Sequence, residues 1–494
     1  MSSLYPTSNY TVVTFRIEYC GPYFCRLQYR RRSGKCAENF LDFVAILQQT
    51  FPACLVLRLP SRLPRPHTYG FSNVSNMVRL ALIASFLKRL LSDLARFSSP
   101  ACIAIALFCV GAPCGWETAQ AQDKALPSSK RPQSIHRLRL TKFYDTPDPL
   151  PPGKPGVLIR STAFDEYDLP LGVSAVRLLY HSRSGNGDDV AASGVVLFPD
   201  RKPPAGGWPV IAWAHGLTGV ARQCAPSLTR NLQHGTLLSM YVNIGYAVVA
   251  TDYTGLGTSF RNAFADTPSN ASDVIYSIDA ARCAVPQLSS RWIAMGTGEG
   301  AVNALAVAEL EHDIRDPNYL GSITLSRLAD LQDIFEPLSG VSYNLPLFLA
   351  YGVKTVYPRF EVSDILTDKA LPLYQKIGQS CGQTETGPTV SAAEMLKPNW
   401  ASNKFVQQYF SRNRIGFKSA NSPLLVISSE TDSSINQTTN IVARLCKQGD
   451  RVQFEKYPEY DPGRVIGDSV RDQIAWIQAR FANRSVPTNC SAQR

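Results

Sequence analysis

The 494-residue sequence predicts an α/β protein with a mostly parallel central sheet, helices on both faces of that sheet and a largely helical insertion. Short apolar runs alternate with helix-like segments over residues 209–327 and again over 421–481. This alternation is typical of βα units around a parallel sheet. Residues 328–420 interrupt it with an irregular, largely helical stretch that has many aromatic residues. A glycine-rich turn joins one of the predicted strands to the helix that follows it.

The predicted strands form two groups. Three alternating segments come first and favour antiparallel strands at a sheet edge; they lie near 157–165, 172–182 and 190–198. Buried apolar runs follow at 209–214, 246–251, 291–295, 322–326, 424–428 and 452–457. Helical spacing is found at 227–244, 272–284, 298–311, 438–446 and 469–481. A polar, proline-rich arm precedes all of them at 123–156.

Residues 77–121 have the features of an export signal. Basic residues follow Met77, an apolar run comes next, and Ala119-Gln-Ala121 is a small-x-small cleavage site. The apolar run is too short to span a bilayer comfortably. We therefore expect a secreted or periplasmic protein with no stable membrane span in the mature chain, and a membrane anchor is the alternative. Residues 1–76 have no sustained period, and we interpret them as a non-native or unstructured extension; the alternative is a long, genuine leader.

The positive charge of the chain lies mainly ahead of the predicted mature protein. The formal net charge is +11, but residues 1–76 hold nine Lys/Arg against three Asp/Glu. Residues 77–121 add four against two, so residues 122–494 hold only +3. This nearly neutral part has no basic patch interleaved with aromatic residues, which argues against a nucleic-acid partner. No group of His, Cys, Asp and Glu has the spacing of a metal site, and we expect no cofactor.

The strongest chemical signal is Gly296-Thr297-Gly298-Glu299-Gly300, between a predicted strand and a predicted helix. In α/β-hydrolases this place has the pattern G-x-S-x-G, in which the serine is the nucleophile. The glycines are needed because the turn is strained and the helix packs closely, and the helix N-terminus favours an oxyanion. Here the glycine frame is intact, but the middle residue is Gly298, which has no hydroxyl.

A His–Gly loop follows the strand predicted at 209–214. Such a loop commonly forms the other half of an oxyanion hole through its backbone N–H groups. We therefore expect Gly216 and Leu217, together with Glu299, to form the oxyanion hole. His215 precedes the elbow in the chain, so we interpret it as a structural histidine that holds the loop; a catalytic base is the alternative.

The chain lacks a histidine where a catalytic triad needs one. Asp432 follows a late apolar strand, where the acid of a triad belongs, although an aspartate that caps a turn is an equal alternative. Triads of this fold run in the order Ser, acid, His. The histidines are His67, His136, His181, His215, His234 and His312. None of them follows Asp432, so a triad in the usual order cannot be assembled.

Together these motifs resemble those of the secretory lipases, α/β-hydrolases that cleave triacylglycerols and other carboxylic esters. The likeness covers most of residues 140–490. Its most specific part is Trp213–Gly219, followed by Cys224-Ala-Pro-Ser227. Other similar segments are Phe143-Tyr144, Asp252–Gly257, Asp279–Arg282, and Trp476–Phe481 with Cys490.

The resemblance implies a division of the mature chain and a set of disulfides. It implies an α/β-hydrolase core formed by 122–327 and 421–494, with a cap or lid inserted at 328–420. It pairs Cys224 with Cys381 and Cys446 with Cys490. Cys283 would remain as a buried helix thiol.

The resemblance also implies where the triad would lie. The nucleophile position is Gly298, the acid is Asp432, and the histidine position falls on Pro462 in Tyr457-Pro-Glu-Tyr-Asp461-Pro462. Two of the three triad members are then missing. We therefore predict an exported member of this family that is inactive or strongly impaired as a lipase and retains a cleft for a lipid or ester. Cap residues that would cover an acyl chain, or else form the core of the cap, are Phe335, Tyr343, Leu347, Phe348, Tyr351 and Tyr357.

Two alternatives to this function remain. One is a weak or unconventional ester hydrolase in which the carboxylate of Glu299 or Asp461 activates water; Thr297 precedes the apex and should point away from the cleft. The other, more remote, is a dinucleotide-binding protein, because Gly296 to Ala301 also fits G-x-G-x-x-A. Against it, at least five predicted strands precede this turn, and no clean second strand ends in an acidic residue about twenty residues further on.

Overall fold

The computed structural model describes two units of the chain, Met1–Leu126 and Pro127–Arg494. The described residues are 16–19, 25–28, 136–335, 345–379, 381, 390–420, 422–458 and 463–490. In the first unit, β1 (Arg16–Tyr19) pairs antiparallel with β2 (Cys25–Gln28). The predicted export signal at 77–121 lies outside the described residues.

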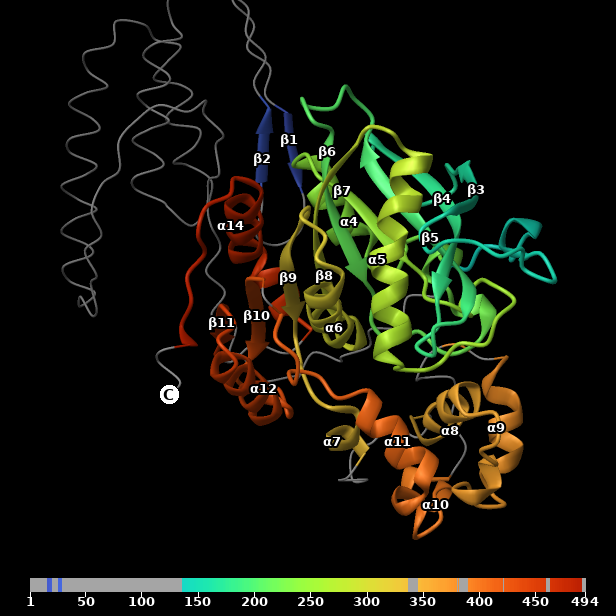
Figure 1. Ribbon diagram of the computed structural model, residues 1–494. Coiled ribbons are helices and arrows are strands. Elements are labelled where there is room, and N and C mark those ends of the chain that lie inside the picture. Colours follow the sequence, from blue (N-terminus) through green and yellow to red (C-terminus); the bar gives the residue numbers. More distant parts are fainter. Residues whose placement is uncertain are drawn as a thin grey trace, which may run out of the picture. The chain divides into compact units, whose positions relative to one another are not determined.

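One mixed sheet organises the described part of the second unit (Figure 1). Its strands are β3 (Leu158–Ala163), β4 (Val173–Arg183), β5 (Asp189–Pro199), β6 (Trp208–Ala214), β7 (Ala247–Thr251), β8 (Leu288–Thr297), β9 (Tyr319–Leu325), β10 (Leu424–Ser429) and β11 (Val452–Tyr457). They lie in the order β11-β10-β9-β8-β6-β7-β5-β4-β3. Strands β6 to β11 are parallel, and β5, β4 and β3 continue the sheet antiparallel to its edge. The predicted mostly parallel sheet with an antiparallel edge is confirmed.

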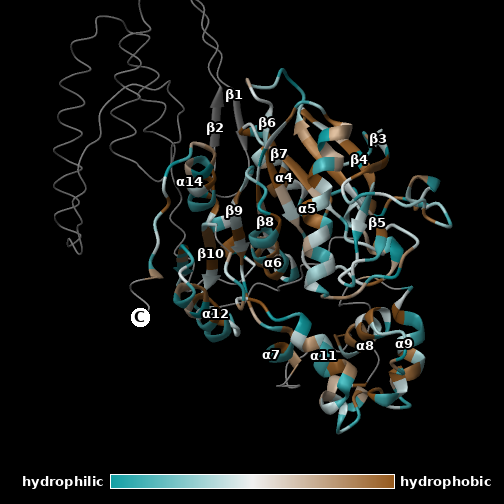
Figure 2. Ribbon diagram, in the orientation of Figure 1, coloured by the Kyte–Doolittle hydropathy of each residue, from teal (hydrophilic) through white to brown (hydrophobic). Residues whose placement is uncertain are grey.

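Helices cover both faces of this sheet, as predicted. On one face lie α5 (Thr267–Ala284), α6 (Glu299–Ile314) and α12 (Ile435–Lys447). On the other lie α4 (Gly235–Asn243), α13 (Val465–Asp468) and α14 (Val470–Phe481). Strands that are buried on both faces are mostly apolar in sequence. Figure 2 agrees with this, because the strands are largely hydrophobic and the helices in front of them have hydrophilic outer sides.

Two helices, α4 and α5, begin five or more residues from the start that the pattern predicted. α4 begins at Gly235 instead of near residue 227 because Leu232 and Gln233 have φ of 48° and 59°, outside the helical region. α5 begins five residues early, at Thr267, where Pro268 in the first turn suits a helix start.

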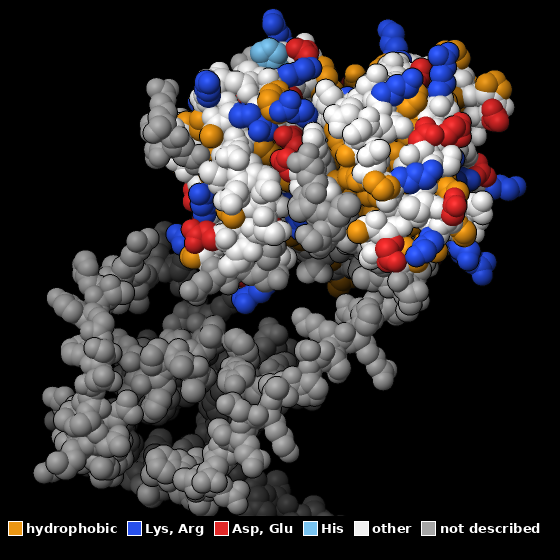
Figure 3. All heavy atoms as spheres, turned by 90° about the horizontal axis from the view of Figure 1, so that it is seen from below, with side chains coloured by type: hydrophobic (Ala, Val, Ile, Leu, Met, Phe, Trp, Pro, Cys, Tyr) orange, Lys and Arg blue, Asp and Glu red, His pale blue; other side chains and the backbone are white. Residues whose placement is uncertain are grey.

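The segment between β9 and β10 is helical and lies beyond the carboxyl ends of the parallel strands (Figure 1). It contains α7 (Leu331–Phe335), α8 (Leu345–Val356), α9 (Leu371–Ile377), α10 (Ala392–Met395) and α11 (Lys404–Arg412), with single 3-10 turns at Val362–Asp364 and Trp400–Ser402. Figure 3, seen from the side of these helices, shows hydrophobic side chains near the middle of the face and charged ones spread around them.

The aromatic residues of this segment form a core of their own. Phe335 and Phe348 are fully buried and pack in one cluster with Leu347. Tyr351 and Tyr357 are partly buried against that cluster, and Tyr343 lies outside the described residues. The interpretation of these side chains as core therefore holds for Phe335, Leu347 and Phe348.

The last helix of the segment is fixed to the α/β core by polar contacts. The Tyr409 hydroxyl donates to the backbone carbonyl of Phe264. Arg412 Nε lies 2.8 Å from Oδ1 of the buried Asp266. Asn413 Oδ1 accepts a hydrogen bond of 2.8 Å from the backbone N–H of Thr267. These contacts hold α11 against the start of α5.

Both predicted disulfides are present, Cys224–Cys381 and Cys446–Cys490. The prediction for the remaining thiol was wrong: Cys283 is on helix α5 as expected, but its side chain is exposed. The neighbouring Ala280 and Ala281 take the buried face of that last turn, which turns Cys283 to solvent.

In the described residues, no helix has the length and apolar character needed to cross a membrane.

Loss of the Cys224–Cys381 bond should destabilise the fold more than loss of Cys446–Cys490. The first closes a loop with a sequence separation of 157 and the second one of 44. Restriction of the unfolded chain then contributes about 5 and about 4 kcal/mol. Urea unfolding of the Cys224→Ala, Cys381→Ala pair and the Cys446→Ala, Cys490→Ala pair checks this order. A larger loss in the second pair would contradict it.

Candidate active site

Gly298 forms the apex of a sharp turn between β8 and α6. Its φ is 60° and its ψ is −122°, a conformation that residues with a side chain rarely adopt. A Cβ built on Gly298 would have its nearest contact at 3.8 Å, with Cα of Gly216. That is an ordinary van der Waals distance, so the place of a side chain at the apex is open.

The flanking glycines have no such space. A Cβ on Gly296 would lie 2.0 Å from the carbonyl oxygen of Gly300. A Cβ on Gly300 would lie 2.0 Å from the carbonyl oxygen of Ala214, at the end of β6. Close packing of α6 against β8 and β6 therefore requires glycine at both positions, as the motif indicated.

The three residues predicted for an oxyanion hole surround this apex. Glu299 is the first residue of α6, so its backbone N–H has no partner within the helix. Gly216 faces Gly298 at the distance given above, and Leu217 lines the same cavity as Gly298 and Glu299. The structure thus brings the His–Gly loop and the helix N-terminus together.

His215 is held inside the protein by backbone carbonyls. Its Nδ1 lies 2.6 Å from the oxygen of Gly216 and its Nε2 lies 3.0 Å from the oxygen of Asp252. The ring stacks on Tyr253 with centroids 4.2 Å apart. Burial lowers the pKa of His215 to about 4, so the ring is neutral at pH 7 and donates a hydrogen bond to only one of these two carbonyl oxygens. His215 does not line the cavity described below, which favours the structural interpretation over a catalytic base.

A buried carboxylate fixes the chain after this loop. Asp252 accepts hydrogen bonds from the backbone N–H of Ser227 at 2.8 Å and from its hydroxyl at 2.5 Å. The hydroxyl of Ser193 donates to the same carboxylate at 2.6 Å. Burial raises the pKa of Asp252. The network ties the segment that carries Cys224 to β5 and β7.

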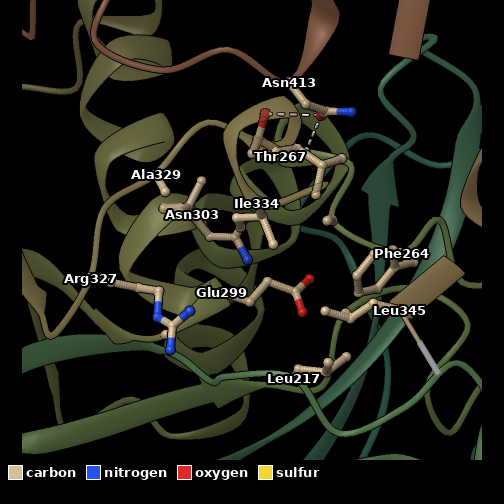
Figure 4. Close-up of a pocket in the computed structure, with 14 residues that line it drawn as sticks. Leu217, Phe264, Thr267, Glu299, Asn303, Arg327, Ala329, Ile334, Leu345 and Asn413 are labelled. Carbon is tan, nitrogen blue, oxygen red and sulfur yellow. Dashed lines mark hydrogen bonds between the residues drawn. The ribbon is translucent and has the colours of Figure 1, made fainter. Parts of the chain in front are cut away.

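A cavity of about 410 Å³ lies over the elbow (Figure 4). Its apolar lining consists of Leu217, Phe264, Ala265, Val302, Ala329, Leu331, Ile334 and Leu345. Its polar lining consists of Thr267, Glu299, Asn303, Arg327 and Asn413, and Gly298 completes the wall. Among the described residues, the aromatic candidates for covering an acyl chain (Phe335, Phe348, Tyr351 and Tyr357) do not line this cavity; Leu331, Ile334 and Leu345 do so in their place. Thr297 is buried at the end of β8 and does not line it either.

Glu299 brings a carboxyl group into the cavity, where it is directed toward Leu345 (Figure 4). Asn270 Nδ2 donates a hydrogen bond of 3.1 Å to its Oε1. Burial raises the pKa of Glu299 to about 7, and the hydrogen bonds from the Ala265 backbone and from Asn270 oppose this rise only in part. The side chain therefore exchanges a proton near neutral pH.

The two carboxylate oxygens of Asp432 have different surroundings. Asp432 is buried just after β10, and its Oδ1 accepts a hydrogen bond of 2.8 Å from the backbone N–H of Ser434. This contact fits the turn-capping interpretation. Its Oδ2 is also buried, and none of the described residues forms a hydrogen bond with it. In a triad this second oxygen would accept a proton from the histidine. Pro462 and Asp461 lie outside the described residues.

The secretory lipase family model matches residues 223–489. The chain belongs to the secretory lipase family. No curated protein sequence gives a significant match.

Solved structures of lipases and esterases resemble this member of the secretory lipase family. The rice cell wall degrading esterase LipA from Xanthomonas oryzae is 17% identical over 67% of this chain and 100% of its own, with a TM-score of 0.56. Candida antarctica lipase A is 17% identical over 71% of this chain and 87% of its own, with a TM-score of 0.59. A putative hydrolase from Legionella pneumophila is 17% identical over 67% and 100%, with a TM-score of 0.54. These likenesses show the α/β-hydrolase fold.

Sequence reasoning missed one charged residue of the cavity of this family member, Arg327. It follows β9 at the carboxyl edge of the sheet, where ligand-binding side chains of α/β proteins gather. That position was its only signal, because it belongs to no motif. Ser326, with φ of 81°, turns the chain so that Arg327 is exposed toward the cavity while Leu328 returns to the core.

Replacement of Glu299 by Gln should stabilise this secretory lipase family member at alkaline pH. The folded-state pKa of about 7 lies above the ordinary 4.5, so the stability contributed by the protonated carboxyl is complete below about pH 4.5 and is lost as pH rises through about 7. The gain in the free energy of unfolding for Glu299→Gln is then on the order of 2 kcal/mol at about pH 8, allowing for partial exposure, and near zero at about pH 4.5. Urea unfolding of both chains across this range checks it. Asp273 and Glu311 also have pKa values of about 7, but both residues are present in the native protein and in the variant. Their titration therefore cancels in the difference between the two. A difference independent of pH would contradict the prediction.

Proposed function

We propose that this secretory lipase family member does not cleave esters by the serine mechanism and instead binds a lipid or ester in the cavity over its elbow. The observation that carries the proposal is the elbow itself. Its glycine frame and its apex conformation have the form that a nucleophile requires, yet Gly298 has no attacking oxygen. The open place at the apex faces a largely apolar cavity with room for a ligand.

The missing base supports the same conclusion. No histidine follows Asp432 in the sequence, and Asp432 Oδ2 is buried with no hydrogen-bond partner in the part of the chain that the structure describes. A nucleophilic serine and its histidine act as a unit, and loss of either typically costs on the order of a million-fold in turnover. Thr297 offers no replacement because its side chain does not line the cavity.

Glu299 supports a second candidate function, ester hydrolysis by a carboxylate and a water molecule. Its carboxyl group lies in the cavity next to the open apex and has a pKa of about 7. A carboxylate of this pKa is suited to take a proton from an attacking water at neutral pH. In this mechanism Glu299 would then return the proton to the leaving alcohol, and the amides of Leu217 and Glu299 would stabilise the oxyanion.

We also propose that the protein is exported. The secretory family and the two disulfides are consistent with an oxidising compartment. The export signal predicted at 77–121 would leave a core of 122–327 and 421–494, with the helical cap at 328–420.

Ester turnover by the purified chain tests the proposed function. We expect a short-chain p-nitrophenyl ester to be hydrolysed at the buffer rate and a fluorophosphonate probe to label nothing, while a fluorescent acyl probe binds. Turnover with labelling of the chain would overturn the proposal in favour of a serine enzyme. Turnover that is abolished by Glu299→Gln, without labelling, would establish the second candidate in its place.

A further inference from the structure

We propose that the ligand of the cavity is a free monocarboxylic acid with an apolar chain, rather than its ester, and that Arg327 binds the carboxylate. This inference rests on the proposed function, since it names the ligand of the same cavity. The observations that carry it are the position of Arg327, its lack of a partner, and the apolar character of the rest of the wall.

Arg327 has a free guanidinium in the part of the chain that the structure describes. The side chain lines the cavity, and none of the described residues forms a hydrogen bond or an ion pair with it. The acidic residue nearest along the chain, Asp330, is already engaged by Arg444 at 3.2 Å and by the backbone N–H of Ile415 at 3.0 Å. The positive charge at the cavity is therefore not neutralised by its own segment.

Glu299 does not neutralise it either. Although both side chains line the cavity, the guanidinium of Arg327 and the carboxyl group of Glu299 form no ion pair with each other in the described structure. Figure 4 shows the Glu299 carboxyl group directed toward Leu345 and the guanidinium of Arg327 on the other side of the cavity. Glu299 is instead held by Asn270 at 3.1 Å.

A carboxylate matches this arrangement better than an ester does. A lipid that enters the cavity takes water away from the guanidinium, which is costly unless an anion replaces the water. An ester offers only a neutral carbonyl oxygen. A carboxylate offers two oxygens in the geometry that a guanidinium binds through paired hydrogen bonds. The apolar residues Leu331, Ile334 and Leu345 then provide the surface for the alkyl chain.

The glycine at the apex removes an obstacle to this ligand. A serine at position 298 would place its hydroxyl in the space over the elbow, where only Gly216 Cα comes within 4 Å of a built Cβ. With Gly298 that space is open to the head group. The N-terminus of α6, which begins at Glu299, adds a field that favours an anion there.

Calorimetric titration of the full chain with octanoate and with methyl octanoate tests this inference. We expect octanoate to bind at least tenfold more tightly than its methyl ester. Arg327→Gln should weaken octanoate binding at least tenfold and leave the ester unchanged, so that the preference disappears. Arg414→Gln is the matched control, because Arg414 stacks on Phe417 and does not line the cavity; it should leave both affinities unchanged. Circular dichroism of each variant confirms that it is folded.

The outcomes separate this inference from the proposed function. Equal affinity for the acid and the ester, or an acid preference that survives Arg327→Gln, would overturn the role of Arg327 and leave the proposed function standing. Hydrolysis of methyl octanoate by the native chain, or binding of neither compound, would overturn the proposed function and the named ligand with it. Loss of octanoate binding in Arg414→Gln to the same degree would show a general charge effect and also overturn the role of Arg327.

Discussion

The double variant Gly298→Ser, Pro462→His is expected to hydrolyse p-nitrophenyl esters at least about a thousandfold faster than the native chain, while each single variant stays at the native rate. A serine side chain fits at the apex, because a Cβ there meets only Gly216 Cα at 3.8 Å. The serine alone has no base to take its proton, and the histidine alone has no nucleophile to serve. The gain should therefore be strongly non-additive.

Asp432 provides the control for this experiment. Its Oδ2 is buried and no described residue forms a hydrogen bond with it, so it is available to orient an introduced histidine. Asp432→Asn in the double variant should remove most of the gained rate while Oδ1 remains as the turn acceptor for Ser434. Rates are measured with the purified full chains under identical conditions. A double variant that stays at the native rate although it folds would show that the cleft no longer has the geometry of a lipase site.

The strands were predictable from sequence because burial imposes a simple pattern on them. Strands such as β6 and β10 are covered on both faces, so most of their residues are apolar, and the polar residues of β10 come only at its end. Helix starts depended on single residues instead. The positive φ of Leu232 prevents α4 from starting earlier in the chain, and hydrophobic periodicity does not predict such a backbone angle. The exposure of Cys283 likewise follows from which side of α5 meets the sheet.

The candidate site was predictable where glycine geometry determines it. Close backbone contacts allow only glycine at positions 296 and 300, so the pair of glycines can be recognised in the sequence. The cavity wall was not predictable in the same way. Any apolar side chain of suitable size could take the place of Leu331 or Ile334, so their role depends on how the helical segment packs. Arg327 is a single basic residue outside any motif, and its role as a candidate ligand contact follows only from its place in the cavity wall.

Alanine at Gly296 or Gly300 is expected to cost more than about 4 kcal/mol of folding free energy or to prevent folding, whereas alanine at Gly298 should cost only about 1–3 kcal/mol. At the first two positions the new methyl group would lie 2.0 Å from a backbone carbonyl oxygen, which cannot move without separating α6 from the sheet. At Gly298 the space is open, and the cost comes only from holding alanine at a φ of 60°.

Urea unfolding of the three alanine variants distinguishes two states of the elbow. If the apex has kept the conformation of a nucleophile turn, Gly298→Ala is folded, mildly destabilised and clearly separated from the other two variants. If the loss of the serine has allowed the turn to relax into another path, the three costs would be similar and the apex would no longer present a side chain to the cavity. The comparison is sharp because the three glycines lie close together in the chain but differ in what surrounds their Cα atoms, and only Gly298 of the three has a positive φ. It also reports on the conformation that the serine-restoring variant needs, without depending on any catalytic rate.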